Sequence, residues 1–580
     1  MTRWAKDVTP ENVWQEYPRP QMRRKDWLNL NGLWQYKIAP KEQNKVTEFN
    51  GQILVPFPIE SALSGVKCPL RSDEQLWYRR MFSIPPTWCE KRVLLHFGAV
   101  DWETQVFVNS RLVGEHVGGY LPFWFDISDV LVKGGNELIL SVWDPTDTHW
   151  QQRGKQVLKP KTIWYTAISG IWQTVWLEPV PQTYISSLKI IPDIDAGIVC
   201  IKVKLSGKKI SVRRVRVRIA DAGLLSAVGE MDPVETEMRI PLPRFKLWSP
   251  NSPNLYDVEA VAGEDKVDSY FGMRKFSMDR GRLCLNNVPI FQFGPLDQGY
   301  WPDGLYTPPS DEAMRQDIEL VKSLGCNMLR KHVKVEPARF YYHCDKLGLI
   351  VWQDMPNGGS AANEILLYLS NKIGLRHKDR NYRRAGRVEA ASRHDFKREL
   401  REMVDHLCNF TCIGMWVSFN EGWGQFDANK IANWLKDYDP TRPVDHASGW
   451  FDQQGGDCNS LHIYFRKLKG KRVGKRRATV LSEFGAYSLK INEHLWNPSA
   501  EFGYKKFGTR ESLTKAYLDM IEAELKPWVA VGLSAAVFTQ TTDVEDEVNG
   551  YVTYDREVEK MDLLEVREAH RGIFKMNMPY

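Results

Sequence analysis

The sequence predicts a multidomain β plus α/β protein: an N-terminal jelly-roll β-sandwich, an immunoglobulin-like β-sandwich and a C-terminal (β/α)8 TIM barrel. Up to about residue 276, short alternating apolar stretches are separated by clusters of Gly, Pro, Asn and Asp, which is typical of antiparallel sandwiches. From about residue 277, helical stretches alternate with eight short apolar runs. Such alternation predicts parallel β/α units, and eight of them close a barrel.

The two β domains are predicted over residues 1–182 and 183–276. Stretches such as Arg92–Phe97 and Glu137–Trp143 have the length and alternation of strands in the first domain. In the second domain, Val212–Ile219 alternates strictly and turns Arg213, Arg216 or Arg218 toward solvent. We interpret this basic face as a solvated strand surface, in preference to an anion-binding surface.

The barrel is predicted over residues 277–580. Its predicted helices are Asp311–Leu324 (with Ser310 as N-cap), Pro337–Leu347, Asp395–Cys408, Phe426–Tyr438 and Leu513–Leu525. Its eight predicted strands are Ile290–Gly294, Asn327–Arg330, Leu349–Gln353, Ile413–Phe419, Pro443–His446, Ser460–Tyr464, Thr479–Ser482 and Ser534–Thr539.

Composition excludes some functions. A net charge of +6 on 580 residues does not indicate a nucleic-acid partner. The nine Cys are scattered and form no CxxC pair, so we expect buried thiols and no metal site. We find no signal peptide and no run of 18 apolar residues, which predicts no membrane span and a cytoplasmic protein, or a periplasmic or secreted one if a signal has been removed. The 22 Trp suit a carbohydrate partner and a sandwich core equally.

Polar side chains stand at the ends of the predicted barrel strands. The active site of such a barrel lies at the carboxyl ends of its strands. The side chains found there are Arg330, His332, Asp354, Asn420, Glu421, His446, His462, Tyr464, Glu483, Gln540 and Asp543. Packing alone does not explain so many polar strand ends, so we predict that they form one site.

Two of these side chains are glutamates. Glu421 follows the fourth run and Glu483 the seventh, and both can converge over the barrel centre. Glycoside hydrolysis needs such a pair: a proton donor of raised pKa, and a carboxylate that stays ionised to meet the anomeric carbon. Arg330 and Tyr464 are candidates for the donors that keep one carboxylate ionised.

Several motifs carry a resemblance to glycoside hydrolase family 2, which includes β-galactosidases, β-glucuronidases and β-mannosidases. They are Asn29–Trp34, Leu76–Arg80, Gly114–Tyr120, Ser169–Leu177, Phe271–Lys275, Ser418–Glu421 and Ser482–Gly485. The resemblance covers nearly the whole chain. It implies a retaining exo-acting glycosidase with Glu421 as acid/base, Glu483 as nucleophile and Asn420 holding the sugar 2-hydroxyl. It requires no cofactor or metal, and leaves room for a structural cation.

The specificity motifs point to an atypical branch of that family. Arg330-Lys331-His332 places the His one residue nearer the Arg than the galactosidases and glucuronidases do. The Asn-x-Lys triplet of the glucuronidases is not evident, and Asn492-Glu493-His494 stands roughly in its place, which disfavours a glucuronidase. We predict a β-galactosidase-like enzyme that acts on an oligosaccharide or polysaccharide. Arabinosidase, galactofuranosidase or β-mannosidase-like specificity, a transglycosylase, and a non-catalytic carbohydrate-binding relative remain alternatives, and a homo-oligomer stays open.

The remaining predictions concern the rim of the site. We predict that Arg330, His332, Asp354, His462 and Tyr464 bind substrate. Trp301 follows the first run and is either a sugar platform or a loop-packing residue. The basic loops 376–387 and 466–477 either attract an anionic partner or are solvated loops, and we favour the second interpretation.

Overall fold

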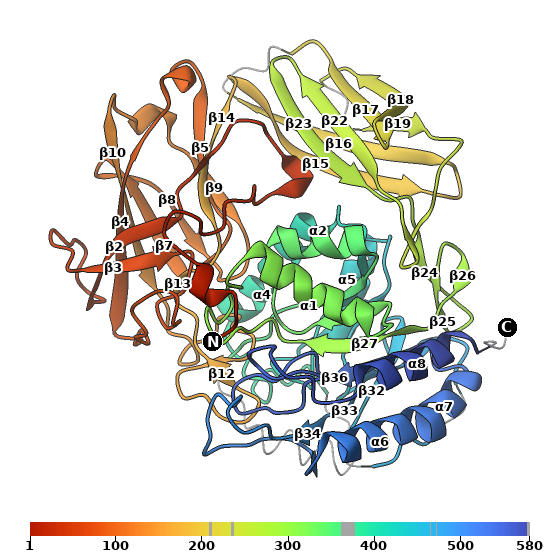
Figure 1. Cartoon of the computed structure of the whole chain (residues 1–580). Helices are drawn as coiled ribbons and strands as arrows, with labels where there is room; N and C mark the ends of the chain where they lie inside the picture. Colours follow the sequence, from red (N-terminus) through yellow and green to blue (C-terminus); the bar gives the residue numbers. More distant parts are fainter. Residues whose placement is uncertain (208–211, 234–236, 361–377, 465, 471–472, 577–580) are drawn as a thin grey trace.

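The computed structural model describes residues 1–207, 212–233, 237–360, 378–464, 466–470 and 473–576. Two β-sandwiches lie beside a barrel surrounded by helices (Figure 1), and this confirms the predicted fold class. Among the described residues, no helix combines the length and the apolar character that crossing a bilayer demands.

The N-terminal domain is an antiparallel jelly-roll sandwich of two main sheets. Its core includes Leu138, Leu140 and Val142, which alternate along one strand and so share one face of the sheet. One sheet contains, in order, β1 (Leu28–Asn29), β14 (Val175–Val180), β5 (Arg92–Phe97) and β9 (Phe123–Asp126). The other contains β3 (Gly51–Val55), β2 (Gly32–Pro40), β4 (Glu74–Ser83), β10 (Gly135–Trp143), β7 (Glu103–Val108) and β8 (Arg111–Val117).

The second domain is the immunoglobulin-like sandwich. One sheet contains β15 (Thr183–Asp193), β16 (Ile198–Gly207) and β19 (Met238–Pro241); the other contains β18 (Leu224–Met231), β17 (Val215–Asp221), β22 (Tyr256–Ala262) and β23 (Asp265–Phe271). On β17, Arg216 and Arg218 are exposed and lie 3.4 Å from Glu230 and 3.9 Å from Glu259. This ion-paired surface agrees with the interpretation of a solvated strand face.

The C-terminal domain is a nearly closed parallel barrel, and each of the eight predicted runs supplies one strand. The strands are β27 (Gln292–Asp297), β28 (Met328–Lys331), β29 (Ile350–Asp354), β30 (Ile413–Val417), β31 (Val444–Asp445), β32 (Cys458–Ile463), β33 (Ala478–Gly485) and β36 (Ala535–Thr539). They follow one another around the barrel in chain order, and β36 pairs with β27. The β30 and β33 strands are therefore three positions apart.

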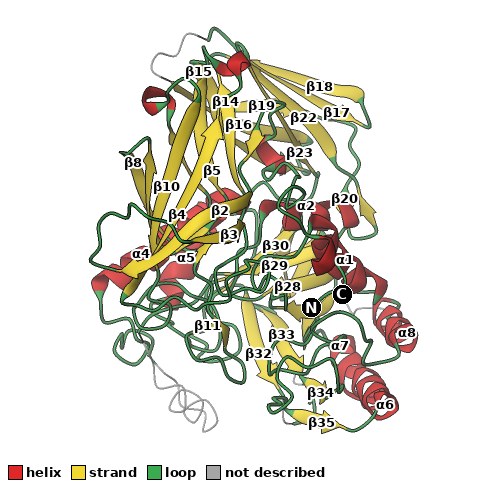
Figure 2. Ribbon diagram, turned by 60° about the vertical axis from the view of Figure 1, so that its left-hand side comes forward, coloured by secondary structure: helices red, strands yellow, loops and turns green. Residues whose placement is uncertain are grey.

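Helices lie outside the barrel strands (Figure 2). They are α1 (Asp311–Ser323), α2 (Ala338–Leu347), α4 (Ala390–Leu407), α5 (Ala428–Tyr438), α6 (Arg510–Met520), α7 (Lys526–Ala530) and α8 (Leu563–Phe574). The predicted N-cap is confirmed, because the Ser310 side chain accepts a hydrogen bond from the backbone N–H of Ala313. A π-helical turn, Ile521–Leu525, joins α6 to α7.

The jelly-roll domain also contributes to the barrel mouth. Its segment from residue 151 to residue 166 carries the short pair β11 (Gln156–Val157) and β12 (Tyr165–Thr166). Tyr165 donates a hydrogen bond to Glu547, and Thr166 donates its backbone N–H to Glu545 at 3.0 Å. We call residues 151–166 the jelly-roll arm. Its last two residues, Tyr165 and Thr166, therefore lie next to the loop that follows the last barrel strand.

Candidate active site

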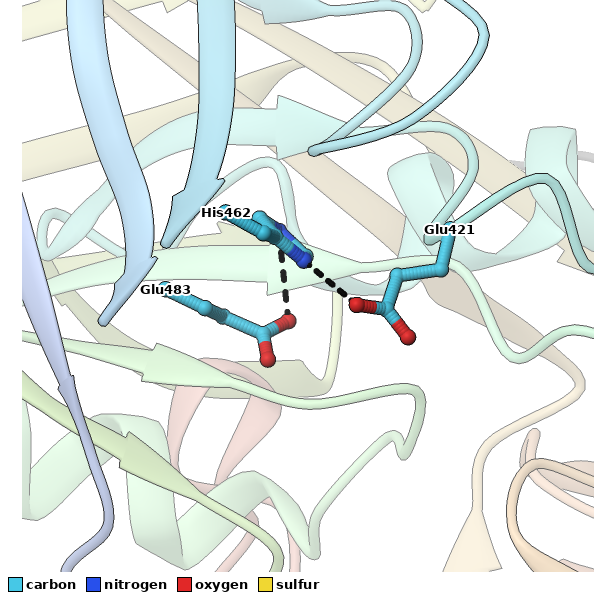
Figure 3. A group of neighbouring side chains, drawn as sticks. All are labelled: Glu421, His462 and Glu483. Atoms are coloured by element: carbon cyan, nitrogen blue, oxygen red, sulfur yellow. Dashed lines mark hydrogen bonds and ion pairs between the residues drawn. The ribbon is translucent and has the colours of Figure 1, made fainter. Parts of the chain in front are cut away.

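The two glutamates point toward one another across the barrel mouth, with His462 between them (Figure 3). Glu483 lies on β33, and Glu421 lies four residues after the end of β30. The backbone of Glu421 has a φ of 49°, a left-handed value that a non-glycine residue keeps only where its surroundings hold it. Its N–H donates to the carbonyl of Ser448 at 3.0 Å, which fixes this turn.

The carboxylates are close enough to act on one sugar. One oxygen of Glu421, one oxygen of Glu483 and one ring nitrogen of His462 all lie within 4.8 Å of one another. His462 Nδ1 is 2.7 Å from Glu421 Oε1, and its Nε2 is 3.4 Å from Glu483 Oε1. Carboxyl groups about 5–5.5 Å apart are typical of double displacement, and wider pairs leave room for a water molecule.

Glu483 is held in its ionised form. Arg330 Nη1 lies 3.0 Å from its Oε1, and Tyr464 donates a hydrogen bond to its Oε2. Burial on its own would raise the pKa of Glu483, but the charges of His462 and Arg330 outweigh burial and lower this pKa below its ordinary value. An ionised carboxylate at neutral pH is what a nucleophile requires.

The pKa of Glu421 is shifted in the opposite direction. Burial raises its pKa, and the negative charge of Glu483 adds to this effect, while the hydrogen bond from His462 opposes it. The result is a carboxyl group that holds its proton to higher pH than an ordinary glutamate. Two neighbouring carboxyl groups whose pKa values are moved apart are the signature of an acid and a nucleophile.

Arg330 organises the floor of the site. It is fully buried and forms a two-pronged ion pair with Asp354 at 3.0 and 2.8 Å. Asp354 also accepts from His332 Nδ1 at 2.9 Å, so both of its carboxylate oxygens are engaged by protein groups. These contacts give Asp354 a role in positioning Arg330 and His332, and its predicted contact with substrate stays a prediction.

Asn420 is held by Arg330, and its amide nitrogen has no hydrogen-bond acceptor among the described residues. Its Oδ1 accepts from Arg330 Nη2 at 2.9 Å. Among the described residues, no group accepts a hydrogen bond from its buried Nδ2. A buried amide donor without an acceptor is costly, so this geometry suits a ligand hydroxyl.

Trp301 packs against protein side chains. Its side chain is buried, its ring packs edge-to-face on Trp4 with centroids 6.1 Å apart, and the Arg556 guanidinium lies 3.9 Å from the ring centroid. Stacking on a sugar needs an open aromatic face, and only 3% of the Trp301 side chain is exposed. The loop-packing interpretation is the one that these contacts support.

The basic loops are only partly described, since residues 376–377 and 471–472 lie outside the described residues. Arg387 is fully buried and donates to the carbonyl of Gly424 at 3.0 Å and to Gln152 of the jelly-roll arm at 2.9 Å. Arg477 forms an ion pair with Asp452 at 2.7 Å. These two side chains stabilise loops and are not available to attract a charged partner.

An aromatic cluster at the mouth was not predicted. Trp164 of the jelly-roll arm packs on Trp423 with ring centroids 4.9 Å apart, and Phe451 completes the buried group. Trp423 stands two residues after Glu421, and this spacing was the signal in the sequence that could have placed it at the site. Trp164 could not be found in this way, because it lies more than 250 residues earlier, in another domain.

Glu421, His462 and Glu483 also offer ligand atoms that could hold a metal ion. Among the described residues, they are the one group of three or more such side chains. Two carboxylates and an imidazole are suitable ligands for a divalent cation such as Zn²⁺. The same atoms serve an acid and a nucleophile without a metal, and hydrolysis by paired carboxylates requires none.

The barrel mouth therefore contains two converging glutamates and an aromatic cluster to which the jelly-roll domain contributes Trp164. Models of glycosyl hydrolases family 2 match the chain over three consecutive ranges: the sugar-binding domain over residues 50–181, the family 2 domain over 183–274 and the TIM barrel domain over 309–531. The chain belongs to glycosyl hydrolases family 2.

Curated relatives and solved structures agree with this membership. A β-galactosidase of Thermoanaerobacter pseudethanolicus is 26% identical over 77% of this chain and 59% of its own length. A β-glucuronidase of Streptococcus agalactiae is 23% identical over 81% of this chain and 84% of its own length. The structure of a β-glucuronidase from an uncultured Clostridium superposes with a TM-score of 0.73 at 18% identity, covering 95% of this chain and 99% of that one. The chain spans about 59% or less of the three curated relatives it matches first.

Proposed function

We propose that this protein is a retaining, exo-acting glycosidase that releases a terminal sugar by double displacement. The observation that carries the proposal is the close approach of two carboxylates with opposed pKa shifts, Glu421 raised and Glu483 lowered. Family membership supports the reaction class. A non-catalytic sugar-binding relative would have no use for both acids in these states.

The reaction has two steps. Glu421 donates its proton to the glycosidic oxygen while Glu483 attacks the anomeric carbon, so the leaving group departs and a glycosyl-enzyme ester forms. Glu421, now ionised, then takes a proton from water, and the water oxygen attacks the anomeric carbon and releases Glu483. Arg330 and Tyr464 hold the nucleophile in place, and His462 orients the acid/base.

For the sugar, we propose a β-galactoside-like glycan substrate as the first to test, because two of the curated relatives, each 26% identical, carry the name β-galactosidase. A panel of nitrophenyl glycosides tests the choice: β-galactoside, β-mannoside, β-glucuronide, β-galacturonide, α-arabinofuranoside and β-galactofuranoside. Turnover of at least one of them supports a glycosidase of this class. Absence of turnover on every pyranoside and furanoside would favour a binding protein.

The pH profile of kcat/KM is predicted from the two carboxyl groups. Because Glu421 must be protonated and its pKa is raised, activity is lost as pH rises through that pKa, above the ordinary value for glutamate. Because Glu483 must be ionised and its pKa is lowered, activity is lost as pH falls through a value below the ordinary one. Initial rates across pH measure both limbs. Glu421→Gln, assayed with a dinitrophenyl leaving group, should no longer lose activity at high pH. If it still did, the loss could not be assigned to Glu421.

Asn420→Ala is expected to lower kcat about 10²- to 10³-fold, because a hydrogen bond to the 2-hydroxyl that strengthens in the transition state stabilises it by several kcal/mol. The free Nδ2 is the donor. The measurement is kcat on a glycoside and on its 2-deoxy analogue, with wild type and variant. The loss should nearly vanish on the 2-deoxy substrate; an equal loss on both would show that Asn420 acts only by holding Arg330.

A further inference from the structure

One buried lysine near Trp423 has no ion-pair partner among the residues that the structure describes. Four lysines are buried in the part of the chain that the structure describes: Lys155, Lys331, Lys334 and Lys560. Three of them are satisfied: Lys331 pairs with Asp297 at 2.8 Å, Lys334 with Glu336 at 2.8 Å, and Lys560 with Asp543. Lys155 has neither an ion pair nor a side-chain hydrogen bond to any described residue, although it is only 5% exposed.

The contacts of Lys155 place it in the sugar site. It belongs to the jelly-roll arm, and its Nζ lies 5.3 Å from the ring centroid of Tyr165 and 5.9 Å from that of Trp423. Tyr165 is anchored to Glu547 of the barrel, and Trp423 stands two residues after the acid/base. The positive charge of Lys155 acts on both Glu421 and His332, lowering the pKa of each.

The position of His332 locates this charge more closely. After burial, the charge of Lys155 is the largest cause that lowers the pKa of His332, while its effect on Glu421 is smaller than those of His462 and Glu483. His332 lies on the floor of the site, bonded to the Asp354 that holds Arg330. His332 also packs near Trp423, with ring centroids 6.5 Å apart, so Lys155 and His332 both lie close to this one aromatic side chain of the site.

The side chain of Lys155 is 5% exposed, and its Nζ is not among the fully enclosed polar atoms, so the unpaired ammonium keeps some contact with solvent. Lysines are almost never fully buried without a partner, because removing the charge from water costs far more than weak contacts with aromatic rings return. A ligand that carries a negative charge at this position would complete the ion pair. Tyr165 and Trp423 would flank it and exclude water, which strengthens the attraction.

We propose that Lys155 is a specificity residue that binds the carboxylate of an acidic terminal sugar. The inference rests on the proposed glycosidase function and names the substrate class of that site. It makes no choice of ring configuration, so a galacturonic and a glucuronic acid both fit. The cation comes from the jelly-roll domain, which the reaction itself does not use.

Calorimetric binding of two sugar pairs tests the proposal: D-galactose with D-galacturonate, and D-glucose with D-glucuronate. The members of each pair differ by the carboxylate alone. In at least one pair, wild type should bind the acid about 10-fold or more tightly than the neutral sugar, since a hydrogen bond to a charged group has about this effect. Lys155→Gln should abolish that preference and leave the affinity for the neutral sugar within about 3-fold.

Two variants control for folding and for charge. Lys155→Arg keeps the cation and should retain most of the preference for the acid. Lys159→Gln makes the same charge change at an exposed position of the same arm and should behave as wild type. The proposal is overturned if wild type binds neither acid, if it prefers the neutral sugar in both pairs, or if Lys155→Gln weakens the acid and the neutral sugar equally.

Failure here is distinguishable from failure of the proposed function. Binding is measured without turnover, so it does not depend on the chemical step. A protein that hydrolyses neutral glycosides but shows no carboxylate preference would keep the proposed function and lose only the role of Lys155. A protein that prefers acidic sugars but hydrolyses no glycoside, acidic ones included, would give the reverse result.

Discussion

Replacing Glu483 with alanine is expected to lower kcat about 10⁴- to 10⁶-fold, the loss typical of removing a nucleophile on which a covalent intermediate depends. Azide should restore part of the rate, because the small anion fits where the carboxylate was and attacks the anomeric carbon directly. The product should then be a glycosyl azide of inverted anomeric configuration. Rates with and without azide, and NMR of the product, measure both effects.

The controls for this variant separate chemistry from folding. Glu493→Ala removes an exposed glutamate from the segment that follows the short strand Tyr487–Leu489 and should leave kcat unchanged. Thermal unfolding should show that Glu483→Ala remains folded, although Arg330 loses one of its two carboxylate partners. A residual rate above about 10% of wild type would remove Glu483 from the role of nucleophile.

Glu421→Ala is expected to lower kcat/KM about 10²- to 10⁴-fold on substrates with poor leaving groups, because these need a proton in the transition state. On dinitrophenyl glycosides, whose leaving group needs little protonation, the loss should be much smaller. Azide should again accelerate turnover, but here it attacks the glycosyl-enzyme, so the azide product keeps the anomeric configuration of the substrate.

The opposite outcomes with azide assign the two roles independently of the size of the rate loss. Glu389→Ala, an exposed glutamate at the start of α4, is the matched control and should show no dependence on the leaving group. If Glu421→Ala yielded an inverted azide and Glu483→Ala a retained one, the roles of acid/base and nucleophile would be exchanged.

Much of this fold can be predicted from the sequence because the barrel strands are buried on both faces. Their apolar runs are short and bounded by polar ends, so all eight could be located, and chain order around the barrel placed Glu421 and Glu483 near one another. The alternation of Val215, Val217 and Ile219 with arginines likewise predicted one solvent-exposed face and one buried face of β17.

What could not be predicted depends on contacts between distant segments. Trp301 follows a barrel strand as a platform residue would, yet Trp4 and Arg556 cover its ring. Arg387 belongs to a basic loop that the sequence predicts to be solvated, yet its side chain is buried against the jelly-roll arm. Lys155 could not be predicted as a residue near the site either, because tertiary packing brings it beside Trp423 from the first domain.

The anomeric configuration of the first-formed sugar tests the central claim most directly. Carboxylate oxygens within 4.8 Å of each other predict attack by Glu483 itself, so the hydrolysis product should appear first as the same anomer as the substrate. Proton NMR during the first minutes of hydrolysis, before mutarotation, gives this result with any glycoside that the protein cleaves. Initial release of the opposite anomer would mean that water attacks directly, and would contradict the account of Glu483 as a nucleophile.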